Sequence, residues 1–375
     1  MKKLLILLLA IPAFCLAQKQ KELPKTYDLL IGTYTSGESK GIYVYRFYAE
    51  TGKMAYLSQI EGLTNPSYLC VSDNGKFIYA VSETNTGTVS AYKFDKTTGK
   101  IELINTQPVG ASPAYVSIDK DQKNIFVANY NGGSLTVVPV NKDGSLGAPS
   151  QTLQQQGSGA DKNRQAAPHV HAAVLSPDEK RLFVTDLGTD KINVYRYKDS
   201  KTPPLTAESP AFVSTEPGSG PRHLEFSADG KFLYVVHELT AVVTAYSVDG
   251  AKLTPIQTIP MNDASYKGRN GAADIHLSPN GKYLYASNRG EANEIVAYTV
   301  NPVTGQLTFL SRTKTIGKTP RNFIVDPTGK FLVVANQGSN TVNVFAIDQK
   351  NGLLNPTRNQ IEINMPAVLK MVAVE

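Results

Sequence analysis

One sequence unit recurs along this chain and restricts its fold more than any other feature. It reads Pro-x-x-apolar-x-apolar-Ser-x-Asp/Asn-Gly-Lys-aromatic, followed by a run of apolar residues. The clearest copies are PSYLCVSDNGKFIYAVSE from Pro66, PRHLEFSADGKFLYVVHE from Pro221 and PRNFIVDPTGKFLVVANQ from Pro320, and weaker copies begin at Pro113, Val170 and Ala272. Aligned on their central turns, the copies start 47, 57, 51, 51 and 48 residues apart. A period near 50 residues built from short strands predicts a β-propeller.

Each copy divides into four short β segments, a to d, which read SYLCVS, KFIYAVSE, TVSAYKFD and KIELINTQ in the first copy. Gly-containing pairs favour tight turns from a to b and from c to d. Near the N-terminus, YDLLIGTYT, GIYVYRFYA and MAYLSQI match b, c and d with no a segment before them, whereas the last segment, from Pro366, matches an a segment. We therefore expect an all-β, seven-bladed propeller whose C-terminal strand completes the N-terminal blade and removes an open sheet edge.

The composition agrees with a single turn-rich domain. The chain has 375 residues, of which 41% are hydrophobic and 19% charged, with 29 Gly and 22 Pro. The longest segment outside the repeat, residues 151–167, is rich in Gln, Gly and polar residues and is predicted to be a surface loop. We expect a signal peptide over 1–17, a linker over 18–26 and the propeller domain over 27–375.

The first 17 residues have the pattern of an export signal. Lys2 and Lys3 precede an apolar stretch from Leu4 to Phe14, and small residues end at Ala17. The apolar stretch is too short to span a bilayer, and bulky Phe14 disfavours a lipid anchor on the cysteine that follows it. We expect cleavage after Ala17, a periplasmic or secreted protein, and no stable membrane anchor after cleavage.

Charge and cysteine content exclude several classes of protein. Loss of Lys2 and Lys3 lowers the formal net charge from +6 to +4, which is too small and scattered to predict nucleic-acid binding. Only Cys70 remains after cleavage, so no internal disulfide is expected, and its apolar neighbours predict a buried thiol. The sequence has no Gly-x-Ser-x-Gly elbow and no Rossmann or P-loop glycine pattern, so neither a serine hydrolase nor a nucleotide cofactor is predicted.

The repeat departs from itself at positions that should meet at one mouth of the central channel, where a segments start and b segments end. One place after the Pro position the copies carry Ser67, Ala114, His171, Arg222, Ala273 and Arg321. The next place carries Tyr68, Tyr115, Ala172, His223, Asp274 and Asn322, and the top of b carries Glu83, Tyr130, Leu187, Glu238, Arg289 and Gln337. The propeller architecture alone would place the same residue at this position in every blade. Charged residues in only a few blades therefore predict a ligand site.

Three arginines from different blades, Arg222, Arg289 and Arg321, are predicted to surround this mouth without acidic partners. The guanidinium group matches phosphate and carboxylate, so the arginines indicate a small anionic ligand. Arg269, in the loop before Asp274, is a candidate fourth contact. The alternative is a purely structural Arg–Glu network that ties the blades together.

All five histidines lie in or beside these columns: His169, His171, His223, His237 and His276. Position favours a functional role for His171 and His223 and a packing role for His237 and His276, although His276 also lies on the predicted channel wall. The His-x-His pattern at 169 and 171 is too common to predict a metal site. We expect a site without metal or cofactor, in which Glu238 or His171 acts as acid or base.

Four segments together resemble one known family: GPRHLEFSADGKFLYVVHEL (220–239), AADIHLSPNGKYLYASNR (272–289), TPRNFIVDPTGKFLVVANQ (319–337) and VHAAVLSPD (170–178). Over about residues 27–374 the chain is similar to the seven-bladed propeller lactonases. These comprise bacterial 6-phosphogluconolactonases of the propeller type and fungal carboxy-muconate lactonizing enzymes. The resemblance implies a propeller lactonase domain over 27–375.

The resemblance also implies roles for individual residues. The catalytic group of the lactonizing enzymes, one His, two Arg and one Glu, matches His171, Arg222, Glu238 and Arg289. For the remaining rim and channel residues, His223, Asp274, His276, Arg321 and Arg269, we expect substrate binding. Family members that act on 6-phosphogluconolactone work in the cytoplasm, so the export signal leaves the natural substrate open.

The expected function is therefore hydrolysis of a small anionic sugar lactone by an exported, monomeric lactonase of the 6-phosphogluconolactonase type. Two alternatives stay open at this point. One is a lactonizing cycloisomerase, and the other is a binding or scaffold propeller without catalysis, because a fold does not fix a function.

Overall fold

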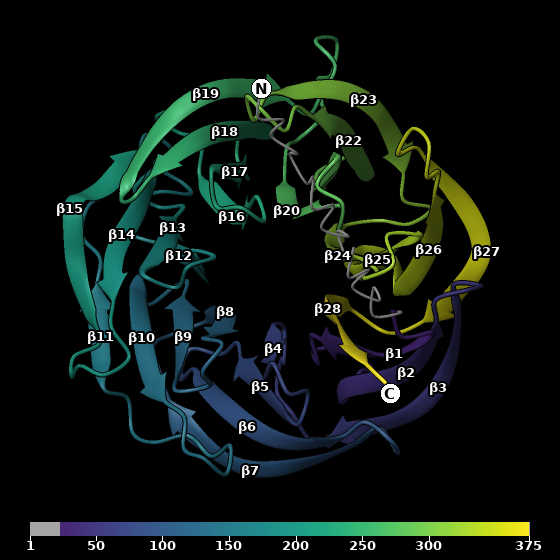
Figure 1. Ribbon diagram of the computed structural model, residues 1–375, viewed down its shortest axis with the longest axis horizontal. Helices are drawn as coiled ribbons and strands as arrows, with labels where there is room; N and C mark the ends of the chain where they lie inside the picture. The colour runs from purple at the N-terminus through teal and green to yellow at the C-terminus, as the bar shows by residue number, and fades with distance from the viewer. Residues whose placement is uncertain (1–22, 375) are drawn as a thin grey trace, which may run out of the picture.

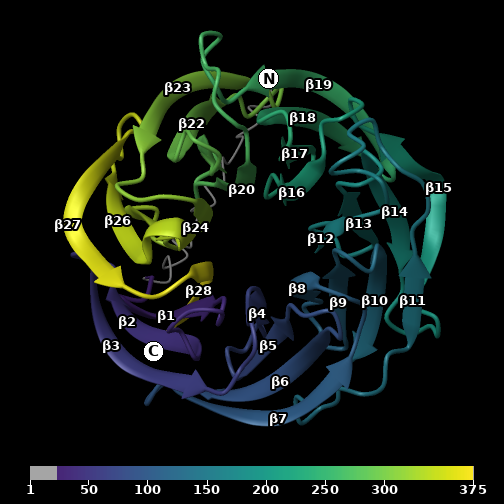
Figure 2. The ribbon, with the colours of Figure 1, turned by 180° about the vertical axis from the view of Figure 1, so that it is seen from behind.

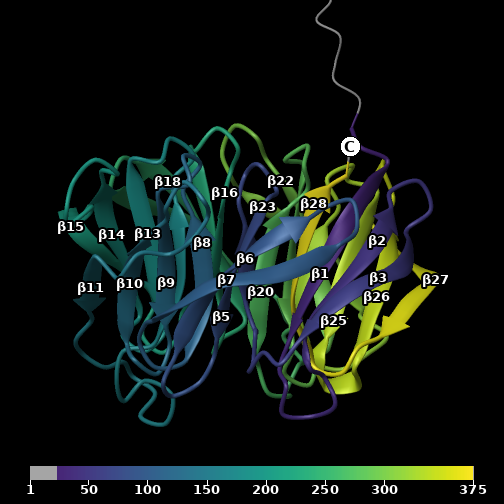
Figure 3. The same cartoon turned by 90° about the horizontal axis from the view of Figure 1, so that it is seen from below.

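The computed structural model describes residues 23–374 and shows seven four-stranded antiparallel sheets arranged as a ring (Figure 1). The predicted seven-bladed propeller is thereby confirmed. The predicted signal peptide over 1–17 lies outside the described residues, as do residues 18–22 of the predicted linker. Seen from the side, the strands run between two rims on which the loops gather (Figure 3).

Each blade contributes one strand to each of four concentric layers. The innermost strands are β28 (Pro366–Ala373), β4 (Leu69–Val71), β8 (Pro113–Ile118), β12 (Val170–Leu175), β16 (Pro221–Phe226), β20 (Ala272–Leu277) and β24 (Pro320–Val325). The second layer is β1 (Thr26–Thr33), β5 (Phe77–Ser82), β9 (Asn124–Asn129), β13 (Arg181–Asp186), β17 (Phe232–His237), β21 (Tyr283–Asn288) and β25 (Phe331–Asn336).

The outer two layers complete the blades. The third layer is β2 (Gly41–Tyr48), β6 (Thr88–Asp95), β10 (Ser134–Pro139), β14 (Lys191–Tyr197), β18 (Val242–Asp249), β22 (Glu294–Val300) and β26 (Thr341–Ile347). The outermost strands are β3 (Lys53–Glu61), β7 (Lys100–Pro108), β11 (Gln151–Gln154), β15 (Leu205–Ser214), β19 (Lys252–Pro260), β23 (Leu307–Lys314) and β27 (Leu354–Glu362). One 3₁₀ turn, η1 (Gln337–Ser339), follows β25.

The polar part of the repeat builds the turn between the two innermost strands. In the fifth sheet along the ring, the hydroxyl of Ser227 donates to Asp229 Oδ1 at 2.7 Å and accepts from the Phe232 amide at 3.0 Å. Gly230 completes the turn with φ +70°, a conformation that glycine adopts without strain. Equivalent contacts recur at Ser72 and Ser278 with Asn74 and Asn280, so Ser-x-Asp/Asn-Gly encodes a hairpin in these three blades.

The aromatic residue of the repeat joins each blade to the next. A Cβ placed on Gly144 would lie 2.2 Å from the ring of Phe77, and one on Gly305 would lie 2.4 Å from the ring of Phe232. Each glycine belongs to the outer turn of the following blade. The aromatic ring therefore lies so close to the turn that a side chain larger than that of glycine would clash with it.

The two ends of the described chain meet in one blade (Figure 2). Strand β28 pairs antiparallel with β1 from Tyr27↔Ala373 to Thr33↔Pro366, and β1 continues to β2 and β3. The predicted closure by the C-terminal strand is confirmed. No inner strand in this part of the chain is left without a neighbouring strand.

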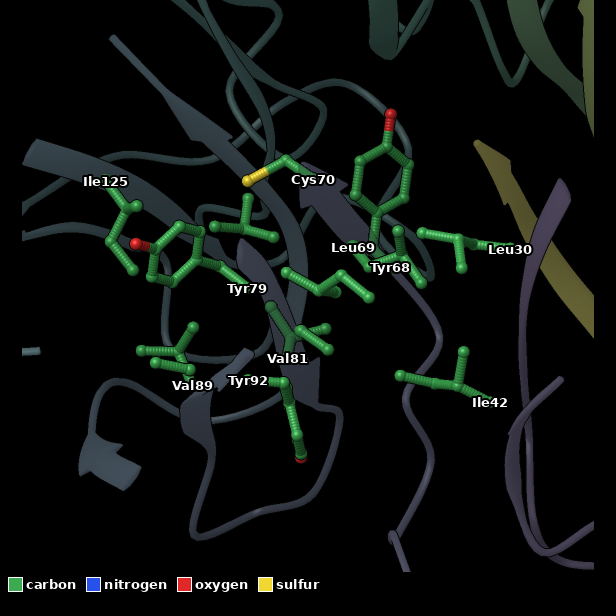
Figure 4. Packing of buried hydrophobic residues seen from close by; sticks show 14 of the residues in the cluster. Leu30, Ile42, Tyr68, Leu69, Cys70, Tyr79, Val81, Val89, Tyr92 and Ile125 are labelled. Carbon is green, nitrogen blue, oxygen red and sulfur yellow. The ribbon is translucent and has the colours of Figure 1, made fainter. Parts of the chain in front are cut away.

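Apolar side chains fill the space between blades. One cluster joins Leu30 and Ile42 of the shared blade to Leu69, Tyr79 and residues of the next blades (Figure 4). Cys70 lies in this cluster, and burial raises the pKa of its thiol to about 12. The predicted buried, unreactive thiol is confirmed.

One sequence expectation is wrong in part. Residues 151–154 are not loop but form β11, the outermost strand of their blade, which pairs with β10 from Ser134↔Gln154 to Val137↔Gln151. A short strand of polar residues at the solvent edge has no apolar pattern to reveal it. Among residues 23–374, no helix is long and apolar enough to cross a membrane.

Candidate active site

A β-bulge near the start of the inner strand positions the candidate residues. In β12 the pairing with β13 passes from Val170↔Asp186 to Ala172↔Thr185, so His171 is an additional, unpaired residue. Arg222 and Arg321 occupy the same bulge position in β16 and β24. Bulges redirect a side chain without unfolding a strand. The column that breaks the sequence repeat is therefore the column in which the backbone leaves regular pairing.

These residues line a cavity of about 220 Å³ at one mouth of the channel. Its lining residues are Tyr34, Glu83, Ala114, Tyr130, Arg164, His171, Glu238, Arg289 and Arg321. The predicted convergence of inner-strand starts and second-strand ends is confirmed for this set. A cavity of this volume suits a molecule about the size of one sugar ring.

Glu238 is the hub of the cavity because three arginines converge on its carboxylate. Arg164 Nη2 donates to Oε1 at 2.7 Å, while Arg222 Nε at 3.0 Å and Arg289 Nη2 at 2.9 Å contact Oε2. Arg222 is only 2% exposed and also donates from Nη1 to the carbonyl of Ala273 in the next blade. The three arginines come from three blades, so Glu238 links blades across the mouth.

The surrounding arginines keep the Glu238 carboxylate ionised. Burial alone would raise the pKa of Glu238, but Arg289, Arg222 and Arg164 lower it to about 2. Burial and the nearby Arg289 and Arg321 lower the pKa of Arg222 to about 9, which still leaves it a cation at neutral pH. The arginines thus repel one another, and one carboxylate does not neutralise them.

His171 is a neutral imidazole beside these cations. Burial, followed by the charge of Arg222, holds the pKa of His171 well below its usual range. Its ring packs edge-on against Tyr130 and against His223, with centroids 5.4 and 5.2 Å away. Among the described residues its buried Nδ1 has no hydrogen-bond partner. At neutral pH, His171 can accept a proton.

Arg321 occupies the opposite wall of the cavity. Its guanidinium lies over the ring of Tyr34 at 5.0 Å from the centroid, and Nη2 is 3.9 Å from Glu83 Oε2. Glu83 also accepts from the Tyr34 hydroxyl at 2.6 Å and from the hydroxyl of Ser67. Arg321 therefore has a looser acidic partner than the arginines around Glu238.

A second buried carboxylate, Asp274, lies deeper in the channel. His223 Nδ1 contacts its Oδ1 at 2.6 Å, and His276 Nε2 contacts its Oδ2 at 3.2 Å. Asn322 donates to Oδ2 from its side-chain amide and accepts from the Leu369 amide at 2.7 Å on the closing strand. This centre connects four neighbouring inner strands beneath the cavity.

The two histidines around Asp274 have opposite charge states. Burial would lower the pKa of His276, but Asp274 and then Glu225 raise it to about 10, so it is protonated at neutral pH. Burial and Arg222 lower the pKa of His223 to about 4, so its ring is neutral. A neutral His223 donates from Nδ1 to the ionised Asp274.

The structure separates the predicted site residues into three groups. His171, Glu238, Arg289 and Arg321 line the cavity, and Arg222 lies directly behind Glu238. His223, Asp274 and His276 form the deeper centre. Arg269 is not brought to the cavity, because its side chain is 84% exposed and pairs with Glu291 at 3.3 Å.

The expectation of arginines without acidic partners is wrong, because Arg222 and Arg289 both pair with Glu238. The Arg–Glu network considered as the alternative is present, although it leaves an excess of arginine. His237 donates or accepts at Nδ1 with the Ser219 hydroxyl at 3.0 Å inside the blade, in agreement with a packing role. His169 stacks on Tyr130 with centroids 4.4 Å apart.

Two lining residues, Tyr34 and Arg164, were missed from the sequence. Tyr34 directly follows β1, as Glu83 follows β5, so extending the second-strand column to the shared blade would have found it. Arg164 belongs to the long loop before β12, for which no other blade has a counterpart, so the repeat offers no comparison. In residues 23–374 no group of three or more His, Cys, Asp or Glu side chains is arranged to hold a metal ion.

Comparison with known proteins identifies the family. A sequence model of the family described as lactonase, 7-bladed beta-propeller matches residues 28–371. A 6-phosphogluconolactonase of Formosa agariphila is 34% identical over 352 residues, which cover 92% of this chain and 99% of the relative.

Two solved structures are also similar to this chain. A Bacteroides fragilis protein provisionally described as a 6-phosphogluconolactonase is 43% identical with a TM-score of 0.89, covering 93% of this chain and 98% of its own. A periplasmic gluconolactonase of Pseudomonas aeruginosa is 39% identical with a TM-score of 0.89, covering 93% and 100%.

Proposed function

Because this chain belongs to the lactonase family of seven-bladed β-propellers, we propose that it hydrolyses a small anionic sugar lactone to the aldonic acid. A 6-phosphogluconolactonase-like lactone hydrolase is the activity that its relatives support. The anionic substrate, the roles of individual residues and the location outside the cytoplasm are the parts proposed here.

The main support for an anionic substrate is the excess of positive charge around the cavity. Three arginines line it, namely Arg164, Arg289 and Arg321, and Arg222 lies behind Glu238, against the two glutamates Glu83 and Glu238. His171 is neutral, so the formal charge of the group is two positive units. A ligand with a phosphate or carboxylate group would neutralise this excess, and guanidinium donors match the geometry of both.

His171 is the proposed general base. Glu238 has a pKa of about 2 and both its oxygens accept from arginines, so it is a weak and occupied proton acceptor. His171 lines the same cavity in its neutral form. A general base must be deprotonated and within reach of the attacking water, and the buried Nδ1 of His171 has no hydrogen-bond partner among the described residues.

The proposed reaction uses groups that line the cavity together with Arg222 behind Glu238. His171 takes a proton as water attacks the lactone carbonyl carbon, and the carbonyl oxygen gains negative charge. Arg222, whose Nε is held by Glu238, stabilises this charge. The ring C–O bond then breaks, its oxygen receives the proton, and the product is a hydroxy acid. Arg289 and Arg321 hold the substrate.

The N-terminal signal pattern supports a periplasmic or secreted location, and one similar structure is that of a periplasmic gluconolactonase. We propose that cleavage after Ala17 releases a soluble monomer. Fractionation of cells producing the full chain, followed by N-terminal sequencing and size-exclusion chromatography, tests all three points. A protein retained in the cytoplasm with Lys2 and Lys3 intact would contradict the export proposal.

The activity is tested by following acid release from 6-phosphogluconolactone and glucono-δ-lactone, above the spontaneous rate, with the protein from Gln18 onward. We expect saturable acceleration, a preference for the phosphorylated lactone, and no loss after treatment with a chelator. His171→Gln is the matched inactive control. No acceleration with either lactone would overturn hydrolysis, and saturable binding without turnover would then favour a binding propeller. Formation of lactone from an unsaturated acid, without hydrolysis, would favour the cycloisomerase.

A further inference from the structure

Arg164 differs from the other arginines around the cavity in how it reaches its position. Arg222 lies in inner strand β16, and Arg289 directly follows second-layer strand β21. Arg164 instead comes from the loop of residues 155–169 that leads into β12, and it crosses to Glu238 on a different blade. Its side chain is 44% exposed, compared with 2% for Arg222 and 15% for Arg289.

The backbone that carries Arg164 is fixed by its neighbour. Gln165 is fully buried, and its amide nitrogen donates to the Leu187 carbonyl at 2.8 Å and to Asp190 Oδ1 at 2.7 Å. Its amide oxygen accepts from the Asp161 backbone at 2.9 Å. A buried side chain with these bonds resists movement, because each lost bond would leave a buried polar group unpaired. The loop is thus preorganised at this point.

Asp190 connects the loop to the catalytic strand. Its Oδ1 also accepts from the Gly220 amide at 2.9 Å and its Oδ2 from the Gly218 amide at 2.7 Å, just before Arg222 in β16. Gly159 allows the loop to close, because a Cβ there would lie 2.5 Å from the Gln165 amide. One set of hydrogen bonds therefore fixes both the loop and the start of β16.

Arg164 combines a fixed backbone with a side chain that solvent can reach. Its Nη2 contacts Glu238 at 2.7 Å and the Tyr130 hydroxyl at 3.3 Å. Glu238 keeps two other arginines if Arg164 turns away, so the hub remains neutralised when this contact is exchanged. An arginine at the cavity entrance with a replaceable partner is suited to bind the outer end of an incoming anion.

We propose that Arg164 is a specificity-determining residue that binds the phosphate or carboxylate group of the substrate farthest from the lactone carbonyl. Gln165 is its positioning residue. Charge-assisted hydrogen bonds of this kind contribute about 1.5–3 kcal/mol, or roughly 10- to 150-fold in affinity. This inference rests on the proposed function for its substrate class, but it can be tested by binding alone.

The test compares ligands that differ by one anionic group. Calorimetric titration measures Kd for 6-phosphogluconate, glucarate and gluconate with the wild-type protein, Arg164→Gln and Lys162→Gln. Lys162 lies on the same loop, is exposed, and is not part of the cavity, so its variant controls for loss of one positive charge. We expect Arg164→Gln to weaken 6-phosphogluconate at least tenfold and gluconate less than threefold, with Lys162→Gln unchanged.

The outcomes separate the possible explanations. A tenfold loss for glucarate but not 6-phosphogluconate would identify the second group as a carboxylate, and the reverse would identify a phosphate. Equal losses for all three ligands, or no loss for any, would overturn the specificity role. Lactone hydrolysis by the same proteins is recorded separately. Absence of turnover in the wild type would defeat the proposed function while leaving the binding result to decide the role of Arg164.

The positioning role of Gln165 is tested by combining its substitution with that of Arg164. Gln165→Met keeps the length of the side chain but removes its hydrogen bonds. We expect it to weaken 6-phosphogluconate binding in the wild-type background and to have no further effect in the Arg164→Gln background. Circular dichroism and the melting temperature show whether both variants are folded. Additive losses in the double variant would contradict positioning of Arg164 by Gln165.

Discussion

Two buried carboxylates, Glu238 and Asp274, lie in the channel. Their partners differ, and the difference distinguishes a candidate catalytic centre from a structural one. Glu238, at the mouth, is surrounded by arginines that outnumber it and by a cavity. Asp274, deeper in the channel, is surrounded by His223, His276 and Asn322, whose hydrogen bonds are directed at the carboxylate itself. The mouth keeps positive charge in excess, whereas in the deeper centre one protonated histidine, His276, faces two carboxylates, Asp274 and Glu225.

The difference shows that one scaffold can use a buried carboxylate in two ways. Both carboxylates tie neighbouring blades together, and the pKa of each lies below its usual range. Arginine keeps its charge at every physiological pH, while histidine can lose it. We therefore expect the mouth to govern catalysis and the deeper centre to govern stability, with a different response to pH.

The largest expected effect compares one histidine from each centre. His171→Gln should lower kcat for the lactone by roughly 10²–10⁴-fold, the usual contribution of a general base. His223→Gln should lower kcat less than tenfold and instead reduce the free energy of unfolding by about 1–3 kcal/mol, because Asp274 loses a buried partner. Steady-state kinetics and urea unfolding measure both quantities. An equal loss of kcat in the two variants would break the comparison.

The next effect compares the carboxylates themselves at neutral pH. Glu238→Gln leaves the buried guanidinium of Arg222 without its carboxylate, which costs about 3–5 kcal/mol of unfolding free energy. Asp274→Asn should cost less, because His276 is 24% exposed and keeps Glu225 at 3.4 Å. Urea unfolding of both variants beside the wild type measures the loss. A loss below about 1 kcal/mol for either would show that its carboxylate does not hold the blades together.

The pH dependence of these losses distinguishes the centres. His276 has its pKa raised from 6.5 to about 10, so its stabilisation is complete below pH 6.5 and is lost as the pH rises toward 10. Glu238 has its pKa lowered from 4.5 to about 2, so its stabilisation is present above pH 4.5 and is lost only as the pH falls toward 2. Between pH 7 and 8, below the pKa of about 9 of Arg222, the deficit of Asp274→Asn should shrink more than that of Glu238→Gln.

A smaller effect concerns the pH profile of activity. Because the pKa of His171 lies well below 6.5, the proposed base is already deprotonated at pH 6.5. We expect kcat/KM, corrected for spontaneous hydrolysis, to stay constant from pH 8 to 6.5 and to fall only at more acidic pH. A fall centred between pH 6.5 and 7.5 would show that His171 is not the base of the free enzyme.

The smallest expected effect is at Arg269. Its exposed side chain pairs only with exposed Glu291, and isolated surface pairs of this kind contribute about 0–1 kcal/mol. Arg269→Ala should therefore change kcat, KM and the melting temperature very little. A more than fivefold rise in KM would show that Arg269 contributes to substrate binding, contrary to its exposed position outside the cavity.

The repeat predicted the fold because each of its residues has a local task that the sequence displays. Ser227 and Asp229 form a turn and Phe232 packs on the next blade, and these tasks recur at a fixed period. The candidate site was predicted to the extent that it interrupts the same period, as at His171 and Glu238. Arg164 could not be found in this way, because its place depends on a long-range contact through an irregular loop. The repeat also could not predict that Arg222 and Arg289 pair with one carboxylate, because this pairing depends on the conformation of each side chain.

The pairing of β28 with β1 has a consequence for the order of events during synthesis. A ring closed by its last strand stays open until that strand has left the ribosome, and the two inner surfaces that it covers remain without a partner until then. Closure afterwards joins β24 to β4 through β28, completes the Asn322 contact to Leu369, and so connects Asp274 to the far end of the sequence. Assembly of the interior of the channel is thus completed by β28.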